Sequence, residues 1–180
     1  MSDQRERSYD IGSILSEMRQ EYWLGLAAEE TETDELLECL VFTLGGESFA
    51  FETHFAAEVI RVPKLIRVPA VQPVISGVFN LRGEITAAMD IRPMLGLSRP
   101  ELTETARVVV VRSERFATGI LVEKALGVIG LPLEQFEPAP AAKGGERGLI
   151  RGQIGHEGGE IALLDIALLL ASPEIVAGDE

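Results

Sequence analysis

Two similar runs of residues, one in each half of the chain, limit most strongly what this sequence can fold into. Gly83-Glu84-Ile85 followed by Asp90-Ile91 is echoed by Gly159-Glu160-Ile161 followed by Asp165-Ile166. Each run comes after a hairpin pattern and before a leucine-rich stretch, so the order of elements repeats as well. Because one half alone is too short to bury a sufficient core, the repeat predicts two similar β modules packed back to back.

The strand patterns predict a mainly β fold. Residues 40–44 and 48–53 are short aromatic and β-branched runs around Gly45-Gly46, which is typical of a β-hairpin. Residues 74–91 indicate two strands hinged at Arg82-Gly83, because glycine accepts the positive φ of a tight reversal. The further expected elements are a hairpin over 108–122, a loop over 132–148, a strand at 149–152, a helical turn over 55–60, and a buried final helix over 163–171.

Residues 1–38 are expected to form an acidic N-terminal extension. They contain eleven acidic residues and three arginines, and the whole chain has a net charge of −13. Apolar residues between positions 11 and 26 recur at the spacing of an amphipathic helix. The acidic run at 29–38 indicates a solvated linker. The alternative is that the whole segment is a frayed tail, since isolated helices of this length are marginal in water.

Charge and composition exclude several classes of function. An acidic chain has no general attraction to nucleic acid or anionic lipid. No stretch approaches the roughly 20 apolar residues of a membrane span. We therefore expect no nucleic-acid partner and no direct membrane insertion. Cys39 and two histidines do not complete a zinc site, so no metal is expected, and the lone cysteine favours the cytoplasm.

The sequence contains no recognisable catalytic motif. It has no G-x-S-x-G elbow, no H-E-x-x-H, no P-loop and no G-x-G-x-x-G. His54, His156 and Cys39 are interpreted as structural, and so are Glu84 and Asp90, because nothing in the sequence indicates a shifted pKa for either carboxylate. We expect no catalytic residues, no cofactor and no enzymatic activity. The alternative class, an enzyme or small-ligand binder on a β scaffold, lacks a cluster of His, Cys and carboxylates.

Several motifs together resemble the CheW family of chemotaxis coupling proteins. The resemblance covers residue 39 to about residue 172. Its most specific element is the turn Asn80-Leu81-Arg82-Gly83 with Asp90-Ile91-Arg92 downstream. The other matching segments are 39–51, Glu58-Val59-Ile60, 119–123, 138–140 and 150–152.

The resemblance implies two intertwined five-stranded SH3-like β-barrel subdomains that share a core, with short helices and a C-terminal helix. It also implies a non-catalytic adaptor in the cytoplasm, at membrane-associated receptor arrays. Its partners are the cytoplasmic tip of a methyl-accepting chemoreceptor, the regulatory domain of a CheA-type histidine kinase and other CheW-like domains. The CheW-like domain is expected at residues 39–172, between the extension at 1–38 and a tail at 173–180.

The partner-binding residues implied by the resemblance lie in the first half of the chain. Glu58 and Arg82 match family positions that pair with each other near the receptor side, and Asn80, Leu81 and Gly83 complete the turn. The receptor helix is expected in the groove between the barrels. The kinase is expected on an apolar patch of one barrel.

Two departures from the family pattern leave alternatives for the function. Residues 85–89, Ile-Thr-Ala-Ala-Met, replace the usual hydrophobic run after the turn, and Glu123 replaces the usual aspartate after the second hairpin. The N-terminal extension is also longer than in a minimal coupling protein. One alternative is an accessory paralogue for pilus motility or another signalling array. The other is a protein that competes for the kinase without coupling it to a receptor.

Overall fold

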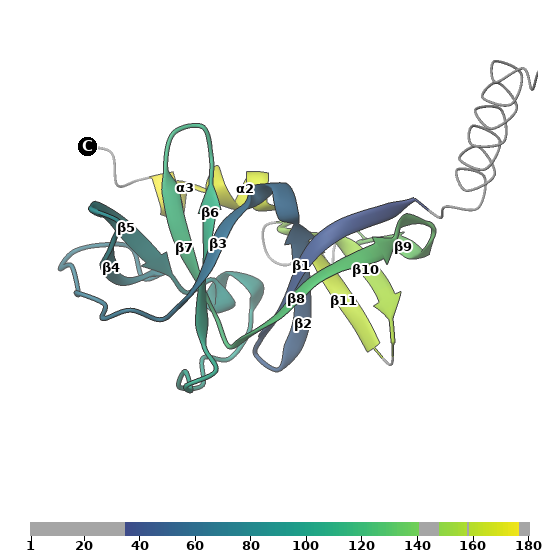
Figure 1. The fold of residues 1–180 in the computed structure, drawn as a ribbon, viewed down its shortest axis with the longest axis horizontal. Coiled ribbons are helices and arrows are strands. Elements are labelled where there is room, and N and C mark those ends of the chain that lie inside the picture. The colour runs from purple at the N-terminus through teal and green to yellow at the C-terminus, as the bar shows by residue number, and fades with distance from the viewer. Residues whose placement is uncertain (1–34, 141–147, 158, 177–180) are drawn as a thin grey trace, which may run out of the picture. The chain divides into compact units, whose positions relative to one another are not determined.

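The computed structural model describes residues 35–140, 148–157 and 159–176 of the 180-residue chain (Figure 1). The amphipathic segment expected at residues 11–26 lies outside the described residues, as does most of the acidic linker. Strands predominate in the described part, and none of its helices is long and apolar enough to cross a membrane.

The first predicted hairpin consists of β1 (Leu36–Leu44) and β2 (Glu47–Glu52). The strands pair antiparallel, with Leu44 opposite Glu47. Gly45 and Gly46 between them have φ of 58° and 79°. This left-handed turn geometry matches the twist of the flanking strands, and it explains why two glycines stand here.

Five strands form one sheet, here called sheet B, in the order β3-β6-β7-β5-β4. All neighbouring strands are antiparallel except β5 and β7, which run parallel. The hairpins β4–β5 and β6–β7 are those predicted from the sequence, and the short 3₁₀ helix η2 (Arg92–Leu95) follows β5. The strands are β3 (Ala56–Arg61), β4 (Ile75–Leu81), β5 (Glu84–Met89), β6 (Arg107–Arg112) and β7 (Ala117–Val122).

The helical turn expected over residues 55–60 is wrong. Only the 3₁₀ helix η1 (Thr53–Phe55) precedes β3. Exposure alternates along β3, so that Ile60 packs against the interior while Val59 faces outward. β-branched residues suit this half-buried strand, and the pairing of β3 with β6 outweighs a weak local helical preference.

The other six strands form sheet A, in the order β8-β1-β2-β11-β10-β9. Neither β8 nor β9 is predicted by the sequence, because Gly127 and Gly130 interrupt the pattern of β8 and β9 lies inside the expected 132–148 loop. The 3₁₀ helix η3 (Leu133–Gln135) separates these two strands. The later strands are β8 (Lys124–Pro132), β9 (Phe136–Pro138), β10 (Ile150–His156) and β11 (Gly159–Leu164).

The final helix is shorter and less buried than predicted. Residues 163–164 belong to β11, and α2 (Ile166–Leu170) begins only after Asp165. The Asp165 carboxylate accepts a hydrogen bond from the backbone N–H of Leu168 at 2.9 Å and so caps the helix. Leu168 itself is 43% exposed, so the expectation of a fully buried helix is wrong. A further turn, α3 (Pro173–Val176), follows α2.

The two sheets have the same construction, which supports the internal duplication. Sheet A holds the hairpin β1–β2 between β8 and the hairpin β10–β11, while sheet B holds β6–β7 between β3 and β4–β5. Each sheet has one parallel pairing, β2 with β11 and β7 with β5. Each half of the chain therefore lends its first hairpin to the sheet of the other half. The halves are intertwined, as the family resemblance implied; the repeat alone predicted two modules packed back to back and did not indicate this exchange of hairpins.

The strand registers correct the alignment of the two halves. In β4–β5 the pairs run from Ile75–Met89 to Leu81–Glu84, and in β10–β11 from Ile150–Leu164 to His156–Gly159. Equivalent residues of these hairpins are thus 75 positions apart. The Gly-Glu-Ile match is displaced by one residue, because Glu84 is equivalent to Gly159 and not to Glu160. Asp90 and Asp165 are equivalent in this register, since they too are 75 positions apart.

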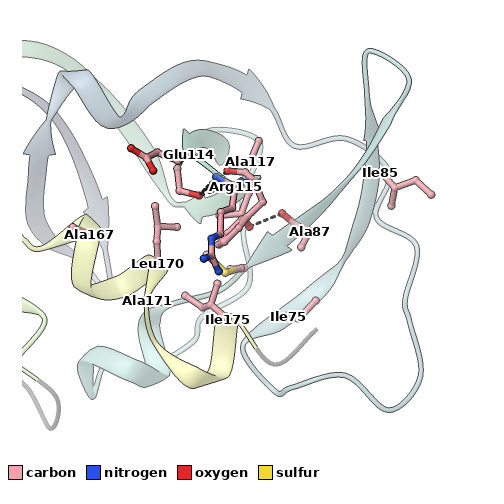
Figure 2. A pocket seen from close by; sticks show the side chains of 14 residues that line it. Ile75, Ile85, Ala87, Glu114, Arg115, Ala117, Ala167, Leu170, Ala171 and Ile175 are labelled. Carbon is pink, nitrogen blue, oxygen red and sulfur yellow. Dashed lines mark hydrogen bonds between the residues drawn. The ribbon is translucent and has the colours of Figure 1, made fainter. Parts of the chain in front are cut away.

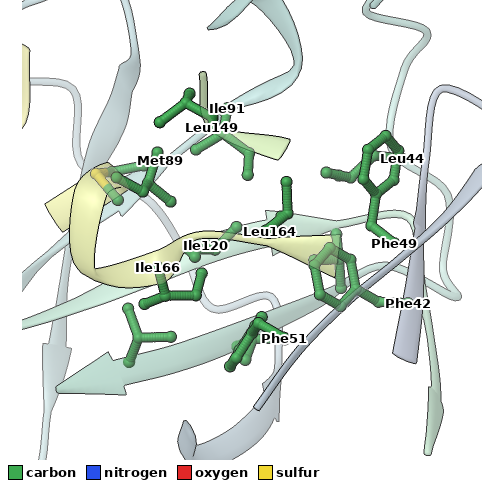
Figure 3. Close-up of a cluster of buried hydrophobic side chains, with 14 of the residues drawn as sticks. Phe42, Leu44, Phe49, Phe51, Met89, Ile91, Ile120, Leu149, Leu164 and Ile166 are labelled. Carbon is green, nitrogen blue, oxygen red and sulfur yellow. The ribbon is translucent and has the colours of Figure 1, made fainter. Parts of the chain in front are cut away.

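The core is shared between the sheets, as the family resemblance implied (Figure 3). Its largest side chains are the three phenylalanines of β1 and β2, which pack with residues of sheet B and α2. Each sheet adds a smaller cluster of its own. The predicted mainly β fold of two SH3-like subdomains around one core is confirmed, although the sheets are not closed into barrels. The core residues labelled in Figure 3 are Phe42, Leu44, Phe49, Phe51, Met89, Ile91, Ile120, Leu149, Leu164 and Ile166.

Candidate functional site

The turn between β4 and β5 holds the candidate residues from Asn80 to Gly83. Arg82 and Gly83 both have positive φ, 53° and 94°. The Asn80 side chain stabilises this geometry, because its Oδ1 accepts a hydrogen bond from the backbone N–H of Gly83 at 2.7 Å. Leu81 is buried and packs into the core of sheet B, so it anchors the turn from below. A left-handed arginine costs roughly 1 kcal/mol relative to glycine, so the backbone conformation itself does not favour a side chain at this position.

Arg82 forms an ion pair with Glu58 on β3, which is the opposite edge strand of sheet B from β4. Its Nη2 donates to Oε2 of Glu58 at 2.9 Å. The Arg82 side chain is 80% exposed and the Glu58 side chain 23%. Such an exposed pair adds little to stability, typically less than about 1 kcal/mol. The structure therefore brings Glu58, Asn80, Arg82 and Gly83 to one exposed surface and keeps Leu81 beneath it.

A second surface feature, which the sequence did not predict, is an open apolar hollow of about 710 Å³ beside this hairpin (Figure 2). Figure 2 shows α2 and α3 lining one side with Leu170 and Ile175, and the β6–β7 hairpin contributing Arg115 and Ala117. The hollow also includes Ile85 of β5, which is 82% exposed.

The alternation of β5 explains why the hollow is open at one end. Ile85, Ala87 and Met89 share one face of the strand, since side chains repeat every second residue. Met89 is fully covered, Ala87 is half-buried, and Ile85 extends past the cover into solvent. The sequence signal that could have indicated this surface is Ile85 itself, which lies in the segment 85–89 that departs from the family's usual hydrophobic run.

A buried charge network joins the two sheets at the end of β5 that lies away from the β4–β5 turn. Arg92 donates to both oxygens of Asp90, from Nε at 2.9 Å and from Nη2 at 2.8 Å. Its Nη1 donates to Glu123 at 3.1 Å, and Arg99 donates to Asp90 at 2.9 Å. Glu123 also accepts from the backbone N–H groups of the Gly45-Gly46 turn, at 2.8 and 3.2 Å. The network therefore ties the end of the β1–β2 hairpin in sheet A to the ends of β5 and β7 in sheet B.

Both carboxylates of this network, Asp90 and Glu123, are ionised at neutral pH. Burial alone raises the pKa of Asp90, but hydrogen bonds from Arg92 and the charges of Arg92 and Arg99 hold that pKa below its usual value. Burial likewise opposes the ionisation of Glu123, and the hydrogen bonds from Gly45, Gly46 and Arg92 outweigh it and lower the pKa. Both carboxylates are ionised and fully bonded. The network is therefore structural and offers no acid or base for chemistry.

The other titratable candidates are not assembled into a reactive cluster. Glu84 and Asp90 lie at opposite ends of β5, so they do not form a carboxylate pair. Burial raises the pKa of the Cys39 thiol to about 11, which leaves it unreactive. His54 is exposed beside Glu52, and His156 ends β10. Among residues 35–140, 148–157 and 159–176, no group of three His, Cys, Asp or Glu is placed to hold a metal.

Comparison with known proteins links this arrangement to one family. The family model described as "CheW-like domain" matches residues 38–174. Similar curated proteins include Chemotaxis protein CheW of Bacillus subtilis, 32% identical over 62% of this chain and 70% of that protein. Chemotaxis protein CheW of Klebsiella aerogenes is 31% identical over 79% of this chain and 86% of that protein. Protein PilI of Pseudomonas aeruginosa is 29% identical over 62% of each chain.

A solved structure supports the fold independently. The scaffolding protein TtCheW from Thermoanaerobacter tengcongensis superimposes with a TM-score of 0.68. The match covers 75% of this chain and 88% of that one, at 20% identity. At this identity the likeness is one of fold.

Proposed function

The chain belongs to the family of CheW-like domains, and from this premise we propose that it is a non-catalytic adaptor in chemotaxis signalling. It couples the cytoplasmic tip of a chemoreceptor to the regulatory domain of a CheA-type histidine kinase. The adaptor works by holding two partners at fixed positions, so it needs exposed recognition surfaces and no reactive groups. It acts in the cytoplasm, at membrane-associated receptor arrays that also contain other CheW-like domains.

The observation that carries this proposal is the Glu58–Arg82 ion pair on a strained, exposed turn. The pair contributes little to stability, and the turn that presents it costs backbone energy. Asn80 and Gly83 hold the Arg82 backbone in place, so the guanidinium is presented in a restricted geometry. We assign the receptor contact to this surface.

The kinase contact is assigned to the apolar hollow around Ile85. A nearly fully exposed isoleucine next to an open apolar depression is the kind of anchor that protein interfaces bury. Ile85 lies only three residues from Arg82, so the two contacts flank a single hairpin. One short hairpin then carries a residue for each partner.

Calorimetric titration of the full chain with receptor-tip and kinase regulatory-domain fragments encoded in the same genome tests the proposal. We expect micromolar affinities, because arrays assemble through several modest contacts. Arg82→Ala and Glu58→Ala each weaken receptor binding, and exchanging the two charges restores more binding than either reversal alone. Ile85→Glu weakens kinase binding and leaves receptor binding intact. Arg112→Ala, at an exposed position on β6, serves as the control.

Two outcomes contradict the proposal. Binding to neither fragment removes the coupling function. Binding to the kinase fragment alone favours the competitor alternative. The likeness to Protein PilI keeps the pilus-motility paralogue as a second candidate, and titration with receptors of flagellar and pilus systems in parallel separates the two.

A further inference from the structure

The segment between β3 and the β4–β5 turn is unusually basic for this acidic chain. Residues 59–83 contain four basic residues and no acidic one, whereas the whole chain has a net charge of −13. Three of them, Arg61, Lys64 and Arg67, are exposed. Within the described part of the chain, none of these three has a carboxylate at ion-pair distance. Their charges therefore face solvent.

This segment also exposes apolar side chains. Ile66 is 62% exposed, and Val68 and Val71 are more than one-third exposed. Val62 and Leu65 pack instead against the core of sheet B, which anchors the chain beneath them. We call residues 61–71 the basic strip.

The backbone of the basic strip is restrained by hydrogen bonds at Ile66 and by prolines within and beside it. The backbone N–H and C=O of Ile66 both bond to Val78 of β4, each at 2.8 Å. Pro63, Pro69 and Pro73 restrict the backbone further, because each fixes its own φ. A preorganised surface pays less entropy on binding than a flexible loop.

The equivalent segment in the other half carries the opposite charge. A bulge in β3 places Glu58 opposite Val110, and a bulge in β8 places Gly127 opposite Val41. Glu58 and Gly127 are therefore equivalent, and so are Pro63 and Pro132, since each proline follows five residues later. After Pro63 come Lys64 and Arg67, and after Pro132 come Glu134 and Glu137.

Both segments occupy the same place in their sheets. A Cβ at Gly77 would lie 2.8 Å from the carbonyl oxygen of Ile66, and a Cβ at the equivalent Gly152 would lie even closer to that of Glu137. The two bulge glycines therefore mark where each segment crosses the edge of its sheet. Both segments thus run beside an equivalent glycine and carry opposite charge, although 132–138 forms η3 and β9 while 61–71 is joined to β4 only by the Ile66–Val78 bridge.

We propose that the basic strip docks an acidic helical segment of the receptor tip and thereby decides which half of this pseudo-symmetric protein the receptor contacts. The strip attracts acidic side chains, and its exposed aliphatic residues cover the apolar face of the helix. The acidic segment at 134–137 repels the same partner from the equivalent position. This inference rests on the proposed receptor coupling and extends that contact beyond Glu58 and Arg82. A receptor helix is favoured over an anionic membrane because a helix can contact the basic strip alone, whereas the extended surface of a membrane also meets the acidic remainder of a chain of net charge −13.

The decisive variant is Lys64→Glu/Arg67→Glu in the full-length protein, titrated with a receptor-tip fragment at low and at moderate salt. We expect affinity to fall about tenfold or more at low salt, and the difference from wild type to shrink as salt increases. Kinase regulatory-domain binding and the melting temperature stay unchanged, since both residues are exposed and unpaired among the described residues. Arg112→Glu alters charge elsewhere on sheet B and leaves receptor affinity near that of wild type.

A charge-exchanged variant separates local from overall charge. Lys64→Glu/Arg67→Glu combined with Glu134→Lys/Glu137→Lys keeps the net charge of the wild type. Its receptor affinity should stay weak, because the Glu58–Arg82 pair and the exposed aliphatic residues of the strip remain in the first half, away from the relocated basic charges. Restoration of wild-type affinity overturns the inference in favour of net charge.

Three further outcomes complete the test. Unchanged receptor affinity in the double variant, with Arg82→Ala still weakening it, overturns the inference and leaves the proposed function standing. Binding of wild type to neither fragment overturns both. Co-sedimentation of wild type, but not of the double variant, with phosphatidylglycerol vesicles overturns the protein partner and assigns the strip to lipid.

Discussion

The two halves of the chain build equivalent sheets but carry different surface chemistry. Positions that the fold requires keep their residue type, as in the pairs Gly77/Gly152 and Asp90/Asp165. Positions on the proposed receptor and kinase surfaces differ. The first half has Asn80, Arg82 and Ile85 where the second half has Gly155, Glu157 and Glu160. The duplication thus supplies the scaffold. The proposed anchors Arg82 and Ile85 lie in the first half, while α2, α3 and the β6–β7 hairpin of the second half line the rest of the hollow.

The equivalent aspartates show how a shared residue acquires different roles. Asp90 and Asp165 each donate their backbone N–H to the residue before the paired strand, Val74 or Leu149, at 2.8 Å. Beyond this, Asp90 binds the buried Arg92. The residue equivalent to Arg92 is Ala167, so Asp165 only caps α2. One substitution two residues downstream decides whether the aspartate is part of an ion network or a helix cap.

The largest expected effect comes from truncating these two aspartates. Asp90→Ala leaves Arg92 buried without its main partner and should lower the free energy of unfolding by about 3–5 kcal/mol. Asp165→Ala removes one helix cap and should cost about 1 kcal/mol. Urea denaturation of both variants measures the difference. Equal losses would show that the two halves are alike at these positions after all.

Lowering the pH should weaken the same network without mutation. The pKa values of Asp90 and Glu123 are lower in the folded protein than in the unfolded chain, so the folded state binds fewer protons. Their contribution to stability is complete above the unfolded-state values, near pH 4, and is lost as the pH falls through the folded-state values. Glu123→Gln should show a shallower loss of stability below about pH 5 than wild type in denaturation curves. A loss as steep as that of wild type would assign the acid sensitivity to other carboxylates.

The smallest expected effect concerns the strained turn. Arg82→Gly relieves the positive φ and should raise stability by about 0.5–1 kcal/mol, even though it removes the ion pair with Glu58. The same variant should weaken receptor binding. Thermal melts and receptor titrations measured together check the trade-off. A loss of stability would mean that the ion pair matters more to the fold than its exposure indicates.

The sequence by itself determined the hairpins, the duplication and the position of the candidate turn. Gly45-Gly46 and Arg82-Gly83 are local signals, because the reversals need positive φ whatever surrounds them. The motif Asn80-Leu81-Arg82-Gly83 also identifies the candidate binding turn from the sequence alone. These features depend on neighbours along the chain.

Tertiary structure alone decided the exchange of hairpins between the halves, the strand β8, and the surfaces at Ile85 and residues 61–71. β8 is stabilised by its long pairing with β1, which compensates for Gly127 and Gly130. Ile85 is exposed near the start of β5, whereas Met89 at its other end packs in the shared core with residues of α2. The opposite charges of the basic strip and the 134–137 segment become meaningful only once the strand registers make the two segments equivalent. Each of these features depends on residues far apart in the chain, and local sequence patterns do not record such contacts.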